Sequence, residues 1–372
     1  MYKIPIVNLK KQISPIRAEI DTAIKKIIDN ADFVFGKEID NFEGEVAKYC
    51  NVKYAVGVSN GTDAIRLALV SVGIQYGDGV ICPAFTYYAT AGAIASIGAI
   101  PVFVDIEPNT YNISIANIEK ILKQKKDKKI KAIIPVHLYG QCADMDSIIR
   151  ISKKYSLKII EDAAQAFGAE YKGKKAGTIG DCGAVSFFPG KNLGAFGDAG
   201  IVLTNSKIIY EKLKILRNQG NRKKYNHLLL GYNNRLDTIQ AAVLNVKLKY
   251  LPSWNKKRQE NAEYFNEKLK DEEVKTPFVP NYTTHIYHQY VLRLNYPSKK
   301  LVEHLNSKGI DSRVYYPKPL HLQKCFQYRG YKKGDFQESE KASIQTLAIP
   351  VHPELIKKEM DYIISSIKDF LS

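Results

Sequence analysis

Short apolar runs alternate with amphipathic stretches between about residue 50 and residue 205. The apolar runs have the length of buried strands, and the stretches between them repeat apolar residues at the spacing of a helix face. This order predicts a mostly parallel sheet covered by helices. We expect strands at Ala55–Val58, Val80–Cys82, Val102–Ile106, Ile130–Val136 and Leu157–Glu161, and helices at Asp63–Val72, Ala89–Ile97, Ile115–Leu122 and Met145–Tyr155.

The pattern changes toward the C-terminus. Two strands, Ala184–Phe188 and Ile201–Thr204, are expected with no helix between them. A less regular remainder follows a long helical pattern, which favours an α+β unit. Its elements are expected at Asp237–Lys249, Trp254–Leu269, His285–Leu294, Lys299–Lys308, Ser312–Tyr316 and Glu354–Leu371. The sequence therefore predicts a large α/β domain over residues 1–250 and a smaller α+β domain over residues 251–372.

The composition is that of a soluble globular protein. Hydrophobic residues make up 45% of the 372 residues and charged residues 25%, enough for a substantial core. No apolar run approaches the ~18 residues of a membrane span, and Met1–Asn8 lacks the pattern of a secretory signal. The five cysteines are scattered, without a CxxC pair. We therefore expect a cytoplasmic protein without disulfides and without a membrane partner.

The chain is basic, with 55 Lys and Arg against 38 Asp and Glu, a net charge of +17. Such a surface attracts nucleic acid or a small polyanionic substrate. The charge is dispersed, and its one dense run, Lys123–Lys131, is predicted to be a solvated loop. No zinc-finger or RNP pattern accompanies it, so we expect no nucleic-acid partner. The histidines are scattered and no HExxH or strand-linked GxGxxG is present, so neither a metal nor NAD is expected.

Polar segments follow several predicted strands, where ligands of parallel sheets bind. Ser59–Asp63 has the Gly61 and Thr62 of a phosphate-binding helix start, and the same residue types also serve as an ordinary helix cap. In Pro83–Thr90, an aromatic ring can stack on a flat cofactor or simply pack. Neither segment decides between its two interpretations alone.

A carboxylate and a lysine follow two further apolar strands. Asp162 ends the strand before Gln165, and a carboxylate buried there needs a partner; it is either a helix cap or the counter-ion of a cationic ring nitrogen. Lys191 lies in a loop between Gly190 and Gly194, a suitable place for a Schiff-base lysine. A lysine, an acid and a phosphate seat are what pyridoxal phosphate requires, so we predict this cofactor.

At these residues the sequence resembles the DegT/DnrJ/EryC1/StrS family, the sugar-nucleotide aminotransferases of the aspartate aminotransferase fold (fold type I). The resemblance runs over nearly the whole chain in ordered blocks, which are NGTDA at 60–64, PAFTYYAT at 83–90, PVHLYGQCADMD at 135–146, EDAAQAFGA at 161–169, SFFPGKNLGAFGDAG at 186–200, GYNNRLDTIQAAVL at 231–244 and YYPKPLHLQ at 315–323. It implies a large, mostly parallel seven-stranded sheet domain with a smaller α+β domain after it.

The resemblance also implies a role for each matching residue. Lys191 would bind the cofactor covalently and move the proton, and Asp162 would pair with the pyridine nitrogen. The remaining cofactor contacts would come from Gln165 on the ring hydroxyl, Tyr87 on the ring face, Gly61, Thr62 and Ser186 on the phosphate, and Asn233 on the phosphate of the neighbouring subunit. The protein would therefore be a homodimer with shared active sites.

The implied substrates are glutamate, as amino donor, and a keto sugar on a nucleotide diphosphate. The stretch after Lys191, Asn192–Gly200, resembles enzymes that act at C3, and a 4-keto sugar is the alternative. The 3-keto substrate is either a UDP-linked N-acetylhexosamine uronate or a dTDP-linked 6-deoxyhexose. Positional candidates for substrate contacts are Arg222, Lys223, Arg235, Tyr316 and His321. A non-catalytic regulatory or DNA-binding protein on the same fold is the alternative of another class.

Overall fold

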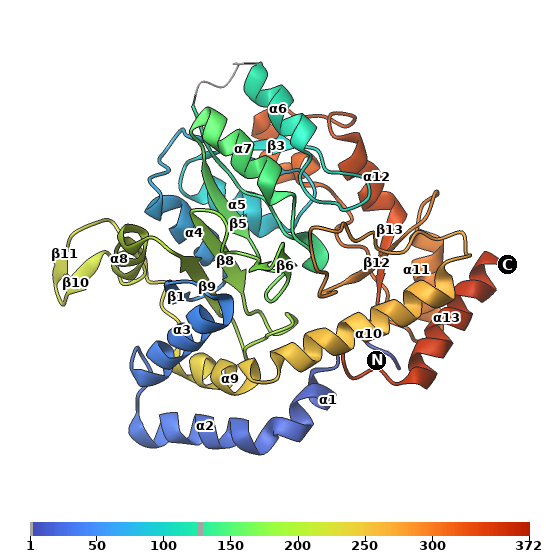
Figure 1. Ribbon diagram of the computed structural model, residues 1–372, viewed down its shortest axis with the longest axis horizontal. Helices are drawn as coiled ribbons and strands as arrows, with labels where there is room; N and C mark the ends of the chain where they lie inside the picture. Colours follow the sequence, from blue (N-terminus) through green and yellow to red (C-terminus); the bar gives the residue numbers. More distant parts are fainter. Residues whose placement is uncertain (1–2, 125–128) are drawn as a thin grey trace.

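A seven-stranded sheet forms the centre of the protein (Figure 1) in the computed structural model, which describes residues 3–124 and 129–372. The strand order is β1-β9-β8-β5-β4-β2-β3. In this sheet β9 runs antiparallel to both of its neighbours, and all other strand pairs are parallel. The sheet is therefore mostly parallel, as predicted. The strands are β1 (Tyr54–Val58), β2 (Gly79–Pro83), β3 (Ile100–Val104), β4 (Ile130–Ile133), β5 (Lys158–Asp162), β8 (Cys182–Ser186) and β9 (Gly200–Thr204).

Helices cover both faces of this sheet, since successive strand residues bury opposite faces. Ile81 packs on one face and Val80 on the other. The first face is covered by α3 (Lys37–Cys50), α6 (Ile115–Lys123), α7 (Met145–Tyr155) and α9 (Thr238–Leu248), and the second by α4 (Gly61–Ser71), α5 (Tyr88–Ser96) and α8 (Lys207–Leu216). The result is the three-layer architecture expected from the alternating pattern.

A separate apolar cluster forms in the C-terminal part of the chain. It contains Phe265 from one end of α10, whereas Leu251 at the other end belongs to the sheet core, so the helix links both clusters. Ile4 from the N-terminus also packs here. The elements are α10 (Leu251–Leu269), β12 (Tyr290–Arg293), α11 (Lys299–Ser307), α12 (Gln337–Gln345), β13 (Thr346–Ile349) and α13 (Lys357–Leu371). A domain boundary near residue 250 stays a prediction.

Of the two strands predicted in the C-terminal part, Ser312–Tyr316 was wrong, and His285–Leu294 is confirmed only over β12, Tyr290–Arg293. Residues 312–316 make a single bridge, from Arg313 to Ala348, and the Ser312 backbone N–H donates to the Asn306 side chain at 3.0 Å instead of to a strand. Residues 285–289 are irregular because Tyr287 has a positive φ of 46°. The sequence pattern also missed β13, α12, α8 and the three N-terminal helices α1 (Leu9–Ile13), α2 (Arg17–Asn30) and α3.

The remaining short elements lie at the periphery or in connections. They are β6 (Glu170–Tyr171), β7 (Lys174–Lys175), β10 (Asn221–Lys223), β11 (Asn226–His227) and the 3₁₀ turns η1 (Ser14–Ile16), η2 (Leu138–Gly140), η3 (Leu320–Leu322) and η4 (Lys324–Arg329). Part of the predicted Lys123–Lys131 loop, residues 125–128, falls outside the described residues. In the parts that are described, no helix has the length and apolar character needed to cross a membrane.

Candidate active site

Asp162 ends β5 at the carboxyl edge of the sheet and is 4% exposed. Its Oδ2 accepts a hydrogen bond from the Thr90 hydroxyl at 2.7 Å, and its Oδ1 accepts one from the Ala164 backbone N–H at 3.2 Å. Burial raises the pKa of this carboxyl, while Thr90, Ala164 and the charge of Lys191 act in the opposite direction. The Thr90 hydroxyl and the Ala164 N–H therefore fix the orientation of the Asp162 carboxyl. The positive charge near it is too weak to offset the effect of burial on its pKa.

Lys191 lies in the loop that follows β8, at the same edge of the sheet. The loop turns tightly, since the Lys191 N–H donates to the Phe188 carbonyl at 2.8 Å, and a Cβ at Gly194 would stand 2.2 Å from the Pro189 oxygen. Burial lowers the pKa of the Lys191 amine to about 8, and the Asp162 carboxylate opposes this shift. The structure thus brings the predicted lysine and acid into electrostatic contact.

Gln165 joins this site through both ends of its amide. Its Oε1 accepts from the Tyr139 backbone N–H at 2.7 Å, and its Nε2 donates to the Tyr316 hydroxyl at 2.8 Å. Tyr139 has a positive φ of 60°, a conformation uncommon for a bulky residue. The Tyr316 ring lies 5.8 Å from the ring of Tyr87, which is 59% exposed. These contacts place Tyr87, Gln165 and Tyr316 in one group.

The turn that is predicted to bind phosphate lies at the start of α4. Asn60 caps the helix, because its Oδ1 accepts from the Asp63 N–H at 2.8 Å, and Gly61 and Thr62 are the first helical residues. Amides at this position have no partner within the helix. A Cβ at Gly61 would stand 2.5 Å from the Ser186 Cβ, so glycine is needed for this approach. Capping and phosphate binding are therefore compatible here.

Asn233 lies at the edge of a hollow of about 510 Å³ in its own chain. The hollow is lined by Val34, Ser59, Asn60, Gly197, Asp198, Asn233, Arg235, Asp237 and Gln240. Asn233 itself is exposed. The N-cap of α9 is Asp237, so Asn233 does not cap that helix.

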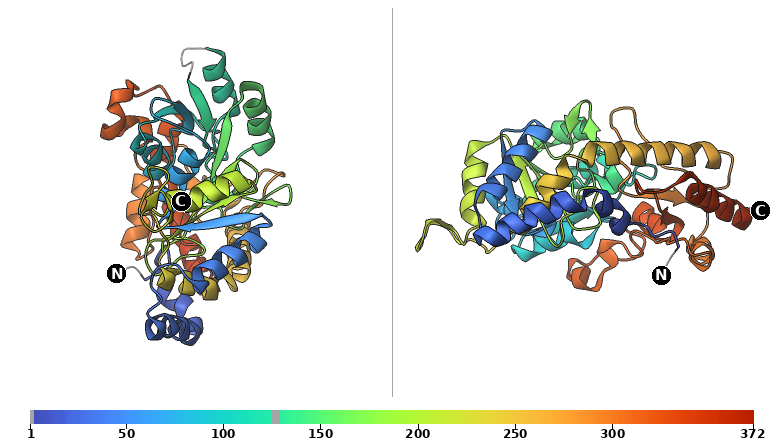
Figure 2. Two further views of the ribbon diagram at one scale, coloured as in Figure 1. Left: turned by 90° about the vertical axis from the view of Figure 1, so that its left-hand side faces the viewer. Right: turned by 90° about the horizontal axis from the view of Figure 1, so that it is seen from below.

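Arg222 and Lys223 lie on a hairpin formed by β10 and β11, which projects beyond α8 in Figure 1 and in the right view of Figure 2. Both side chains are exposed. Arg222 pairs with Glu211 at 3.1 Å across the base of the hairpin. Within one chain, therefore, these two candidates do not join the group around Lys191.

The other substrate candidates differ in position. Arg235 donates to the Asn218 Oδ1 at 3.2 Å and borders the hollow of Asn233. His321 is 1% exposed, and its Nε2 lies 3.0 Å from a Glu340 carboxylate oxygen. Tyr316 alone among the five candidates contacts Gln165 and Tyr87.

Sequence reasoning missed two polar groups beneath Asp162. Thr90 could have been found from the sequence, because it lies in the segment Pro83–Thr90, four residues after Thr86. The hydroxyl oxygens of the two threonines are 3.2 Å apart. No local sequence pattern indicated a role for His137, because its partner Glu161 lies 24 residues further along the chain. The His137 Nε2 lies 2.8 Å from Glu161 Oε2, and both side chains are fully buried. The His137 backbone N–H donates to the Asp162 carbonyl oxygen at 3.0 Å.

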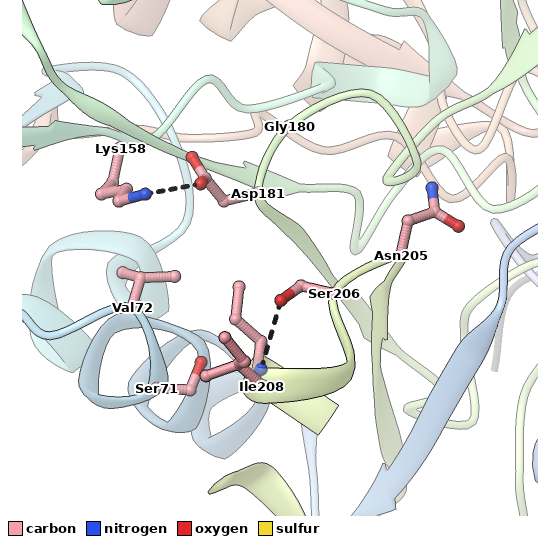
Figure 3. A pocket seen from close by; sticks show the side chains of 9 residues that line it. Ser71, Val72, Lys158, Gly180, Asp181, Asn205, Ser206 and Ile208 are labelled. Carbon is pink, nitrogen blue, oxygen red and sulfur yellow. Dashed lines mark hydrogen bonds and ion pairs between the residues drawn. The ribbon is translucent and has the colours of Figure 1, made fainter. Parts of the chain in front are cut away.

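A second hollow, of about 480 Å³, lies at the opposite end of the parallel strands (Figure 3). It is bordered by the Lys158–Asp181 ion pair, with 3.0 Å between Nζ and Oδ1, and by Ser206 at the start of α8. None of the predicted site residues lines it. Across residues 3–124 and 129–372, no group of three or more His, Cys, Asp or Glu side chains is arranged to hold a metal ion.

Comparison with known proteins gives matches over nearly the full chain. The DegT/DnrJ/EryC1/StrS aminotransferase family matches residues 14–368. A "Pleiotropic regulatory protein" of Geobacillus stearothermophilus is 43% identical over 371 residues, 99% of this chain and 98% of that protein. A UDP-N-acetyl-3-dehydro-alpha-D-glucosamine 3-aminotransferase of Acidithiobacillus ferrooxidans is 40% identical over 365 residues, 98% of this chain and 97% of the relative.

The fold of this chain also matches a solved structure over its full length. S. venezuelae DesV, in complex with a ketimine intermediate, superposes with a TM-score of 0.96 at 37% identity, covering 100% of this chain and 99% of that one. The residues described above fit pyridoxal phosphate, since a buried carboxyl, an amine of lowered pKa and free helix-start amides match its ring nitrogen, aldehyde and phosphate. The chain belongs to the DegT/DnrJ/EryC1/StrS aminotransferase family and is a pyridoxal-phosphate-dependent aminotransferase of fold type I.

Proposed function

We propose that this enzyme transfers the amino group of glutamate to a 3-keto sugar carried by a nucleotide diphosphate. The observation that carries the proposal is the Lys191–Asp162 pair in a chain that matches a sugar aminotransferase over 98% of its length. The name of that relative specifies a UDP-linked sugar with a keto group at C3. A basic surface, with a net charge of +17, favours binding of such a diphosphate.

The cofactor, when bound, supplies an electron sink through its protonated ring. We assign Asp162 to hold that ring proton, with Thr90 and Ala164 keeping the carboxylate in one orientation. Lys191 would hold the cofactor covalently at rest, and its released amine would move a proton between the two carbons on either side of the transferred nitrogen, for which an amine with a pKa of about 8 is suited near neutral pH.

The remaining cofactor contacts follow from the geometry of the turn and loops. Gly61, Thr62 and Ser186 are assigned to the phosphate, because the close approach of Gly61 to Ser186 brings free amides beside a hydroxyl. Gln165, held from both sides, is assigned to the ring hydroxyl. The exposed ring of Tyr87 is assigned to stack on the cofactor.

We further propose a homodimer in the cytoplasm, in which Asn233 reaches the phosphate bound by the partner chain. Its exposure beside the open hollow supports this assignment, as does its absence from the cap of α9. In such a dimer the projecting hairpin would carry Arg222 and Lys223 toward a neighbouring chain, where their charges suit a diphosphate. Arg235, Tyr316 and His321 remain our candidates for the sugar, and Tyr316 has the strongest support because of its contacts with Gln165 and Tyr87.

The position of the keto group and the nucleotide are tested by product analysis. Purified enzyme, glutamate and a panel of UDP- and dTDP-linked 3-keto and 4-keto sugars should give an amino sugar from a 3-keto substrate. The stretch Asn192–Gly200 supports C3, and relatives at 40% identity are named for a UDP-linked 3-keto sugar and for a dTDP-linked 3-amino sugar, so the panel contains both nucleotides. Turnover of 4-keto sugars alone would replace this proposal with the 4-keto alternative.

A regulatory role is the second candidate, because one relative with 43% identity is named a regulatory protein. The two functions differ in what the purified protein must contain. An enzyme should show a visible absorbance band that borohydride bleaches, through the Lys191 amine. A protein that binds DNA, shows no such band and takes up no added cofactor would favour regulation over catalysis.

A further inference from the structure

Lys247, near the end of α9, is a buried lysine that the proposed reaction does not use. It is 1% exposed, and its Nζ donates a hydrogen bond to the carbonyl oxygen of Gly194. Among the residues that the structure describes, no carboxylate forms an ion pair with it. Its other partners are the rings of Phe196 and Trp254, whose centroids lie 5.7 Å and 5.9 Å from the Nζ. The backbone oxygen of Gly194 is therefore its one hydrogen-bond acceptor in the described part of the chain.

The buried amine keeps its charge at neutral pH. Burial lowers the pKa of Lys247 to about 8, and the negative charge of Glu354 opposes this shift. A charged donor makes a stronger hydrogen bond to a carbonyl than a neutral donor does, and the two aromatic rings add attraction for the cation. These interactions offset part of the cost of removing an ammonium group from water. The position of the Gly194 carbonyl is therefore held by a charged contact.

Gly194 belongs to the loop that carries Lys191. The two ends of this loop meet, because the Ala195 N–H donates to the Phe187 carbonyl at 2.8 Å. Within the loop, the backbone of Gly194 lies directly against Pro189, since a Cβ on Gly194 would stand 2.2 Å from the Pro189 oxygen. A displacement of Gly194 would therefore be passed to Pro189, two residues before Lys191 in the sequence.

Two helices, α9 and α10, contact the loop and its end at three alternate positions. The contacts join the Asn192 Nδ2 to the Asn255 Oδ1 at 2.8 Å, the Lys247 Nζ to the Gly194 carbonyl, and the Phe196 N–H to the Gln240 Oε1 at 2.8 Å. Gln240 and Lys247 are two helical turns apart in α9, so they lie on the same face of that helix. The helix pair thus holds the segment that follows Lys191 from one side.

We propose that Lys247 is a positioning residue for Lys191. Its ammonium group holds the Gly194 carbonyl and, through the packing of Gly194 on Pro189, fixes the backbone from which the Lys191 side chain reaches the cofactor. The charge of Lys247 is needed because a neutral side chain of the same size would leave this carbonyl without its donor. The inference rests on the role proposed for Lys191 and concerns how that side chain is aimed.

Three variants separate the charge of Lys247 from its volume. Lys247→Met fills a similar space without a charge or a donor, and Lys247→Arg keeps both. Lys249→Met is the matched control on the same helix, because the Lys249 side chain is 68% exposed and lies 3.9 Å from its partner Glu19. An exposed pair of this kind contributes little to stability, so this control should behave as wild-type enzyme does.

Hydrogen exchange measures the hold on the loop, in full-length enzyme loaded with pyridoxamine phosphate so that Lys191 carries no covalent bond. In Lys247→Met, amides of residues 188–196 should exchange about tenfold faster or more, because a charged hydrogen bond is lost. Lys247→Arg should exchange at the wild-type rate. Unchanged exchange of this segment in Lys247→Met would overturn the proposal. So would an equal increase over the whole chain, which indicates a global loss of stability instead.

The effect on Lys191 is measured by mixing full-length apoenzyme with pyridoxal phosphate and following the visible absorbance by stopped flow. The limiting first-order rate of adduct formation should fall about tenfold in Lys247→Met, because the amine is less well oriented, and should recover in Lys247→Arg. The cofactor concentration that gives half of this rate should stay unchanged, because the phosphate turn of α4 is intact. An unchanged limiting rate, or a change in the half-saturating concentration alone, would contradict a positioning role.

Failure of this inference and failure of the proposed function give different results. If Lys191→Ala still formed the borohydride-reducible adduct, the role of Lys191 would be wrong, whereas the exchange measurement would still report whether Lys247 holds the loop. Should Lys247→Met fold poorly, Lys247→Gln provides the same comparison with a neutral donor that is one bond shorter. It should increase the exchange of residues 188–196 and slow adduct formation, and wild-type values for both would overturn the proposal.

Discussion

Burial acts on two side chains of opposite charge at the carboxyl edge of the sheet. It raises the pKa of Asp162 and lowers that of Lys191, because both lose hydration of their charged forms. Their mutual attraction offsets part of each shift. The protonation state of Asp162 therefore depends on that of Lys191, and a ligand bound beside them would change both pKa values.

Replacing Lys191 tests the residue that we assign to covalent binding and proton transfer. Lys191→Ala should abolish amino transfer and the borohydride-reducible adduct while the circular dichroism spectrum stays unchanged, since the side chain is only partly buried. Lys257→Ala, which removes an exposed lysine paired with Glu260 at 3.2 Å, is the matched control and should keep full activity. Near wild-type turnover by Lys191→Ala would remove this lysine from the mechanism.

Asp162→Asn keeps the shape of the side chain and removes its charge. The variant should still bind cofactor but transfer amino groups at least ~100-fold more slowly, because a neutral ring nitrogen is a weaker electron sink. The rate of each half reaction is followed by stopped-flow absorbance. Asp146→Asn, at an exposed carboxylate that pairs with Lys172, serves as control. A loss smaller than threefold would contradict the role given to Asp162.

Among the elements, the α4 turn and the β8 loop show what local sequence can predict. Both were found from polar residues after apolar runs, because strand ends of a parallel sheet meet at one edge. The residues 312–316 were misassigned, since their contacts come from Ala348 and Asn306 and leave no mark on local periodicity. The contact between the Asn192 Oδ1 and the His288 Nδ1, 3.2 Å apart, could not be predicted for the same reason, because the two residues are separated by 96 positions in the sequence.

Gly61 at the start of α4 offers a test of the phosphate turn. Gly61→Ala places a Cβ 2.5 Å from the Ser186 Cβ, so one of the two segments must shift. Overpacking of this kind costs about 1–3 kcal/mol, and we expect cofactor affinity to fall about tenfold or more. Fluorescence titration of the apoenzyme with pyridoxal phosphate measures the change.

Gly44 in α3 provides the matched control for this substitution. A Cβ there meets no heavy atom within 4 Å. Gly44→Ala should leave cofactor affinity unchanged and stabilise the helix by about 0.5–1 kcal/mol, measured by denaturant unfolding. Equal cofactor affinities for the two alanine variants would refute the close approach of Gly61 to Ser186 as a requirement for binding.

At the scale of the whole molecule, two apolar clusters share α10, and a hairpin projects beyond them (Figures 1 and 2). Tyr225 at the tip of the hairpin is 84% exposed, and Leu230, which follows β11, is 97% exposed. With Leu228 and Leu229, which are also exposed, they form a run of apolar side chains of the kind found at protein–protein contacts. They are consistent with the homodimer that the shared-site proposal requires.

Hybrid dimers test whether each active site contains residues of two chains. Lys191→Ala and Asn233→Ala chains are unfolded together and refolded, so that random pairing makes about half of the dimers hybrids, each with one intact site. If Asn233 serves the partner's phosphate, roughly a quarter of wild-type activity should return. No recovery, with hybrids confirmed by native mass spectrometry, would place Asn233 in the site of its own chain.

Transfer of nitrogen from glutamate to C3 of a nucleotide-linked sugar is the reaction that we propose for this enzyme. It is tested most directly with [¹⁵N]glutamate, the UDP-linked 3-keto sugar and purified enzyme, with the product examined by NMR. In reactions with wild-type enzyme, ¹⁵N should be bonded to C3 of the sugar, and Lys191→Ala should give no labelled sugar. Label at C4, or no labelled sugar from any 3-keto substrate, would contradict the proposed reaction.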